Sequence, residues 1–172
     1  MGRLAPRFPD AGFAEVRYRI RSWKDLPSCI ADGQAALAHL RSAEHVVLLG
    51  FSMGGAVSIA CAGDARARHL VALAPWIPEE ISLHDLAGDR VTVIHGSIDG
   101  WLPALPGVRP SHSRQGADRL RTAGAEVRYE LIRGGFHGVA IRRAGRLIPL
   151  PRAAQWERHV AAALVRAGLR DV

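Results

Sequence analysis

Ser52 is the residue of this chain whose neighbours best suit it to take part in a reaction. It lies between Gly50 and Gly54, after the apolar run 46–49 and before the small-residue segment 55–62. This order predicts a strand, a sharp turn and a helix, with the serine hydroxyl projecting above the end of the strand. Glycines two positions before and two after the serine remove side chains that would collide at such a turn. A hydroxyl presented in this way can act as a nucleophile on a carbonyl carbon.

A chance match is the competing explanation for this Gly-x-Ser-x-Gly pattern. The chain holds 18 glycines and nine serines in 172 residues. That composition alone would give about one accidental match in ten such chains. The apolar run before Ser52 and the helix-like segment after it favour the functional interpretation.

The segment Gly50-Phe51-Ser52-Met53-Gly54-Gly55, placed after a buried strand, resembles the α/β-hydrolase superfamily, particularly its small dienelactone-hydrolase-like and esterase-like members. In that superfamily an acid and then a histidine follow the serine, each in a loop just past a later strand. The resemblance implies a Ser-Asp-His triad that cleaves a small-molecule carboxylic ester through an acyl-enzyme. It also implies that the backbone N–H of Met53 binds the oxyanion.

Two downstream loops match what the resemblance requires. The apolar run 91–94 leads into His95-Gly96-Ser97-Ile98-Asp99, which looks like the acid loop and makes Asp99 the expected acid. An ordinary turn aspartate beside Gly100 is the alternative, and His95 is interpreted as structural because it lies so close to the strand. The second loop contains His137, with glycines on both sides of it, after the alternating segment 127–131. The resemblance makes His137 the expected base.

Three aromatic residues follow strands in the same part of the predicted fold: Trp76, Trp101 and Phe136. We expect them to shape the substrate pocket. No His, Cys or Asp cluster has metal-ligand spacing, and the glycine-rich turn lacks the G-x-G-x-x-G pattern of nucleotide sites. The sequence therefore predicts neither a metal nor another cofactor.

Strand and helix patterns alternate along the chain. Strand patterns occupy 16–20, 46–49, 70–74, 91–94 and 127–131, and helical patterns occupy 27–41, 53–63, 111–123 and 151–166. This alternation predicts an α/β fold, with an open parallel sheet of about five strands and helices on both faces. A length of 172 residues fits one domain, residues 1–172.

The composition limits the partners and the compartment. The net charge is +7, but 22 of the 23 basic residues are arginines spread along the chain, which argues against nucleic-acid binding. No apolar run approaches the length of a membrane span, and no signal-peptide core is present, so we expect no membrane partner and a cytoplasmic location. Cys29 and Cys61 fall in apolar helical patterns and are expected to be reduced and structural. The oligomeric state stays open.

The resemblance also predicts an N-terminal shortening, because the superfamily's earlier strands have no counterpart before Met1. One of those strands carries a His-Gly loop that supplies the second oxyanion N–H. Without it, we expect the strand at 13–20 to pair directly with the central strand at 46–49. Loss of one oxyanion donor costs about 10²–10³ in rate, so we expect weak esterase activity, poor solubility of residues 1–172 and a start codon upstream. A catalytically impaired binding module and an acyltransferase remain alternatives.

Overall fold

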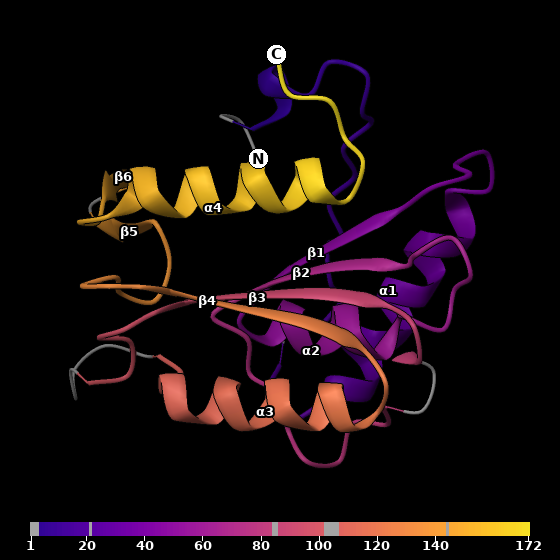
Figure 1. The fold of residues 1–172 in the computed structure, drawn as a ribbon, viewed down its shortest axis with the longest axis horizontal. Coiled ribbons are helices and arrows are strands. Elements are labelled where there is room, and N and C mark those ends of the chain that lie inside the picture. The colour runs from indigo at the N-terminus through magenta and orange to yellow at the C-terminus, as the bar shows by residue number, and fades with distance from the viewer. Residues whose placement is uncertain (1–3, 21, 84–85, 102–106, 144) are drawn as a thin grey trace.

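The computed structural model describes residues 4–20, 22–83, 86–101, 107–143 and 145–172. Four parallel strands form the central sheet in the order β1-β2-β3-β4, namely Val47–Phe51, His69–Leu73, Arg90–Gly96 and Glu126–Ile132 (Figure 1). Their register aligns Gly50 with Ala72 and Ala72 with Val93, so the carboxyl ends of the strands lie along one edge of the sheet. Open α/β sheets bind their ligands at that edge.

Helices cover both faces of this sheet. Figure 1 shows α2 (Met53–Ala60) and α3 (Pro110–Thr122) on one face and α4 (Ala153–Arg166) on the other. α1 (Leu26–His39) packs on α2, and a short 3-10 turn, η1 (Ala5–Arg7), precedes them all. The predicted class, an α/β fold with an open parallel sheet and helices on both faces, is therefore confirmed.

The core has one layer on each face of the sheet, and a further cluster lies between α1 and α2. Leu70 and Ala72 of β2 point toward α2 and α3, whereas Val71 points toward Trp156 of α4. This two-sided burial explains why the β2 segment is apolar without alternation. Cys29 and Cys61 are buried free thiols between α1 and α2, as predicted.

The predicted first strand, residues 16–20, is wrong. The segment joins no sheet and bends at residues 19 and 20, where Arg19 binds the Asp32 carboxylate of α1 through its backbone N–H at 2.9 Å and its guanidinium at 2.5 Å. Tyr18 packs with Cys29 and Val57 in the layer between α1 and α2. These contacts hold the segment over the helices instead of beside β1. The expected direct pairing is therefore absent, and within the described residues β1 pairs with β2 alone.

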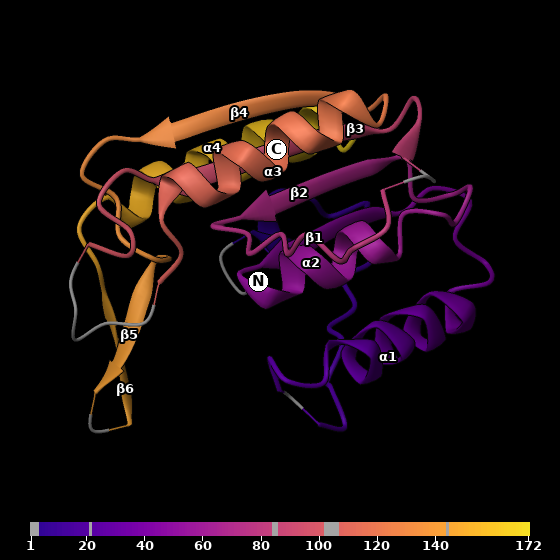
Figure 2. The same ribbon diagram turned by 90° about the horizontal axis from the view of Figure 1, so that it is seen from below.

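A two-stranded antiparallel hairpin, which was not predicted, follows the central sheet. It consists of β5 (Ala140–Arg143) and β6 (Arg146–Pro149), and it projects from the body in Figure 2. The sequence signal was present: aliphatic residues stand on both sides of Gly145, which takes the left-handed φ of +76°. Among the described residues, no helix has the length and apolar character needed to cross a membrane.

Candidate active site

Ser52 forms the turn between β1 and α2, and its backbone is strained. Its φ of 54° and ψ of −116° lie outside the regions that residues with a side chain normally adopt. The turn is fixed by the Ser52 N–H, which donates to the Leu73 carbonyl at 2.8 Å, and by the Trp76 N–H, which donates to the Ser52 carbonyl at 3.2 Å. Strained backbone held by its surroundings in this way is typical of functional sites.

The glycines around the turn differ in how strictly they are required. A Cβ on Gly50 would lie 2.1 Å from the Gly54 carbonyl oxygen, which confirms the steric reason for glycine there. A Cβ on Gly54 would meet only the Tyr18 hydroxyl, at 3.7 Å, so the steric reason predicted for Gly54 is wrong. Gly55 is the second constrained position, because its Cβ would lie 2.7 Å from Pro75.

The structure brings Ser52, Asp99 and His137 together at the carboxyl ends of three strands. His137 Nε2 lies 3.1 Å from Ser52 Oγ, and His137 Nδ1 lies 2.7 Å from Asp99 Oδ2. Ser52 and Asp99 are buried, and His137 is partly exposed. One imidazole therefore bridges a hydroxyl and a carboxylate, which is the geometry that a general base requires.

Asp99 is fully enclosed and has several hydrogen-bonding neighbours. The Val108 N–H donates to Asp99 Oδ1 at 3.1 Å, while His137 and His95 both contact Oδ2. Burial raises the pKa of the Asp99 carboxyl, but the contacts from His137 and His95 outweigh it and hold that pKa below its ordinary value. Asp99 is therefore ionised at neutral pH, although its side chain is inaccessible to water.

His95 lies beside the acid, a placement that the sequence interpretation missed. Its side chain is fully buried at the end of β3, and its Nε2 lies 3.0 Å from Asp99 Oδ2. The available signal was the spacing, since His95 is the last side chain of a buried strand and Asp99 follows it by one tight turn. A side chain in this place can influence the Asp99 carboxylate as well as fill space in the core.

Met53 is the first residue of α2, directly after Ser52. At a helix N-terminus the first backbone N–H groups have no acceptor within the helix. They also point toward the space where negative charge would develop above the serine. The position of the Met53 N–H is therefore compatible with the role expected for it.

An apolar cavity of about 390 Å³ adjoins His137. Phe51, Leu73, Phe136 and Ile141 are among its lining residues, so the placement predicted for Phe136 agrees with the structure. The Phe51 ring lies 4.8 Å from the His137 ring, at 46° to it. The described residues that line this cavity do not include Trp101, whose side chain is 71 % exposed.

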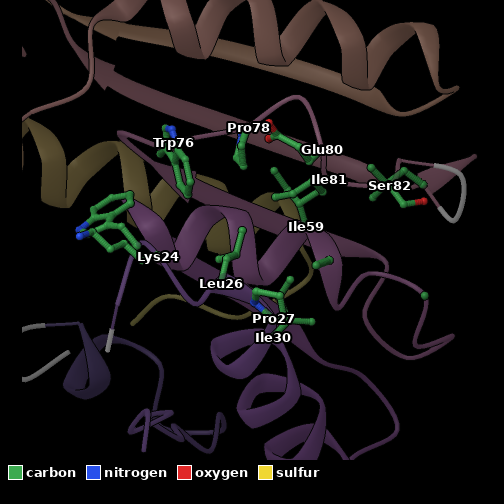
Figure 3. A pocket seen from close by; sticks show the side chains of 14 residues that line it. Lys24, Leu26, Pro27, Ile30, Ile59, Trp76, Pro78, Glu80, Ile81 and Ser82 are labelled. Carbon is green, nitrogen blue, oxygen red and sulfur yellow. The ribbon is translucent and has the colours of Figure 1, made fainter. Parts of the chain in front are cut away.

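Trp76 faces a different cavity, of about 410 Å³, on the α1 side of the molecule. Figure 3 shows it there with Leu26, Ile59 and Ile81, and its ring meets the edge of Trp23 at a centroid distance of 5.0 Å. The backbone of Trp76 contacts Ser52, but its side chain turns toward α1. Of the three expected substrate-binding aromatic residues, only Phe136 lines the cavity beside His137, and a role of Trp76 or Trp101 in substrate binding stays a prediction.

Within the part of the chain that the structure describes, no three His, Cys, Asp or Glu side chains are grouped so that they could hold a metal ion. The chemistry available at this edge of the sheet is that of a hydroxyl, an imidazole and a carboxylate. That set of groups supports nucleophilic and general acid–base catalysis.

The chain matches no protein-family model and no curated protein. It is similar to solved structures, including Arabidopsis thaliana SOBER1 at 14% identity and a TM-score of 0.62, covering 86% of this chain and 67% of that one. MGS-M1, an α/β hydrolase enzyme from a Medee basin deep-sea metagenome library, is 19% identical with a TM-score of 0.64. That match covers 89% of this chain and 70% of that one. A dienelactone hydrolase-like promiscuous phosphotriesterase from metagenomic libraries is 19% identical with a TM-score of 0.62. That match covers 86% of this chain and 64% of that one. The chain thus spans about two thirds of the length of these proteins, and over that span it has the α/β-hydrolase fold.

Proposed function

We propose that this protein is a serine hydrolase that cleaves a small carboxylic ester. The observation that carries the proposal is the continuous contact from Ser52 Oγ through the His137 ring to Asp99 Oδ2, at 3.1 and 2.7 Å. A strained serine backbone at the carboxyl end of β1 adds to it. The similarity to hydrolase structures supports the fold on which these groups stand.

In the proposed reaction, Ser52 Oγ attacks the ester carbonyl carbon while His137 Nε2 takes the hydroxyl proton. Asp99 accepts the Nδ1–H, which fixes the ring and stabilises the imidazolium. The Met53 N–H binds the oxyanion of the tetrahedral intermediate. His137 then donates the proton to the departing alkoxide, the C–O bond breaks, and an acyl-enzyme remains. Water, deprotonated by the same imidazole, releases the acid and restores Ser52.

The cavity beside His137 favours an ester with a small apolar group. Its lining is mostly aliphatic and aromatic, and its volume of about 390 Å³ lies toward the lower end of the range for small-molecule sites. Each methylene that such a pocket accepts contributes about 1–3 kcal/mol to discrimination between substrates. Hydrolysis rates along a series of p-nitrophenyl esters should therefore rise with acyl length and then fall once the cavity is filled.

A fluorophosphonate probe tests the proposal directly, because it reacts preferentially with activated serines. We expect covalent labelling of the wild-type protein at Ser52, located by peptide mass spectrometry, and hydrolysis of p-nitrophenyl acetate. Ser52→Ala should abolish both. Ser42→Ala is the matched control, since Ser42 is exposed and lies in the connection before β1, at the opposite end of the strands from the candidate site.

Two outcomes would favour the alternative functions. A folded wild-type protein that neither labels nor turns over any ester would support a binding module that lacks catalysis. Labelling at Ser52 combined with faster product release in the presence of an added alcohol or amine would support acyl transfer. Hydrolytic activity that survives unchanged in Ser52→Ala would refute the assignment of the nucleophile.

A further inference from the structure

His95, Asp99 and the Val108 peptide unit form a closed ring of contacts behind the candidate triad. His95 Nε2 lies 2.8 Å from the Val108 carbonyl oxygen and 3.0 Å from Asp99 Oδ2. The Val108 N–H in turn donates to the other carboxylate oxygen, Oδ1, at 3.1 Å. Both oxygens of Asp99 are therefore engaged by this ring of contacts, and Oδ2 also meets His137.

The surroundings of His95 fix its tautomer. Both neighbours of Nε2 are acceptors, a carbonyl and a carboxylate, so Nε2 must carry the proton that they share. Nδ1 is buried and has no hydrogen-bond partner among the described residues, so a proton placed there would find no acceptor. The ring is therefore held as the Nε2–H tautomer, with its single N–H directed at Asp99 and Val108.

This ring of contacts also fixes the chain that returns to α3. A Cβ on Gly107 would lie 2.2 Å from Asp99 Oδ1, so the backbone at residues 107 and 108 is in direct contact with the carboxylate. Because His95 holds the Val108 carbonyl and Asp99 holds the Val108 N–H, neither the loop nor the carboxylate can rotate without breaking the other's hydrogen bonds. The orientation of Oδ2 toward His137 depends on all of them.

We infer that His95 is a positioning residue for the hydrolysis, and that it acts through Asp99 by orienting the carboxylate and by sharing its charge. This inference rests on the proposed function. His95 does not touch the reacting atoms, and its effect reaches them through the Asp99 to His137 contact. If His95 only filled space in the core, its replacement by a residue of similar volume would leave the contact between Asp99 and His137 unchanged.

Loss of the His95 donor has a defined effect on the pH profile. Among the described residues, the titratable groups that face the Asp99 carboxylate are His95 from β3 and His137 from the loop after β4. With the His95 N–H gone, more of the carboxylate charge bears on His137, which favours the imidazolium form. The acid limb of the kcat/KM profile should then move to higher pH, by about half a unit to one unit.

The test compares two amide variants that differ in reach. The amide nitrogen of His95→Gln can occupy the place of Nε2, whereas that of His95→Asn lies nearer the place of Nδ1 and cannot contact Asp99. With p-nitrophenyl acetate we expect His95→Asn to lower kcat by about 10- to 100-fold with KM little changed, and to shift the acid limb upward. His95→Gln should restore most of kcat and return the limb to its wild-type position. Equal losses in both variants, or full activity with an unshifted limb in His95→Asn, would overturn the inference.

A double-variant cycle and one measurement on the wild-type protein keep the inference testable. If His95 acts through Asp99, adding His95→Asn to Asp99→Asn should cost far less than it does alone, and additive losses would contradict this. Should His95→Asn fail to fold, ¹⁵N NMR of the wild-type histidines still decides, because an Nε2 of His95 without a proton is incompatible with the proposed role. A wild-type protein inert toward esters and the fluorophosphonate probe would instead refute the proposed function, whatever the tautomer of His95.

Discussion

The two halves of the candidate site are supported very differently. Asp99 follows an inner strand, is 1 % exposed, and is contacted from β3, from the segment before α3 and from the loop after β4. Ser52 follows β1, whose residues Val47, Leu48 and Leu49 are only partly buried. In the described part of the chain, β1 pairs on one side. The acid half thus takes its precision from many hydrogen bonds, whereas the serine half depends on close backbone packing at a few glycines.

Replacement of the acid should give the largest effect. We expect Asp99→Asn to lower kcat for p-nitrophenyl acetate by about 10⁴-fold, because the amide no longer selects the His137 tautomer that accepts the serine proton. Asp118→Asn is the control, since Asp118 is an exposed residue of α3 that pairs with Arg121. A loss below tenfold would mean that the buried, multiply bonded carboxylate is not part of the reaction.

A single added methyl group should destabilise the serine half at Gly50 but not at Gly54. Gly50→Ala places a Cβ 2.1 Å from the Gly54 carbonyl, so we expect it to lower the free energy of unfolding by about 3 kcal/mol. Gly54→Ala adds a Cβ in ordinary contact distance and gains helix propensity, so its stability should change by less than about 1 kcal/mol. Denaturant titration of the pair measures both. Similar losses at the two positions would show that the turn is less tightly packed than these contacts indicate.

The acid half should also appear in the pH dependence of stability. The pKa of Asp99 is lowered in the folded protein, so the ionised carboxylate stabilises the fold fully above its ordinary pKa of 3.8, and this stabilisation is lost as the pH falls through the lower folded value. The free energy of unfolding of the wild type should therefore fall more steeply below about pH 4 than that of Asp99→Asn. Other carboxylates with lowered pKa values, such as Asp64, contribute equally to both proteins. Parallel curves would contradict the stabilising role of the contacts around Asp99.

The smallest effect concerns local motion. Because β1 is partly exposed and paired on one side, its amides should exchange with deuterium faster than those of β3, which is paired on both sides and buried along most of its length. Hydrogen-exchange mass spectrometry of peptides covering residues 47–51 and 90–96 measures the difference. Equal protection would show that the two halves open together and differ in their packing alone.

Sequence patterns predicted the elements that are buried on a regular face. β2, β3, α1 and α4 lie within a few residues of their predicted bounds, since apolar periodicity reports burial directly. The order of Ser52, Asp99 and His137 followed from the resemblance, and the structure brings the three together.

The sequence predictions differed from the structure where contacts between residues far apart in the chain determine the conformation. Residues 16–20 have the alternation of a strand, but Arg19 and Asp32 draw the segment onto α1, and no local pattern reports that pairing. The direction of the Trp76 side chain depends on the turn after β2, where Ala74 has a positive φ of 42°. The place of His95 beside Asp99 depends on the returning backbone at Val108, nine residues further along the chain from the acid.

The hairpin after His137 is closed at its base, where the Leu150 N–H donates to the Val139 carbonyl at 2.8 Å. Ala140 and Ile141 of its first strand line the cavity beside the histidine, whereas Ser52, Asp99 and His137 all stand on the ends of the central sheet. The hairpin therefore contributes to the wall of the cavity, and the three groups lie outside it. We therefore expect changes in the length or sequence of the hairpin to reshape the cavity without replacing Ser52, Asp99 or His137.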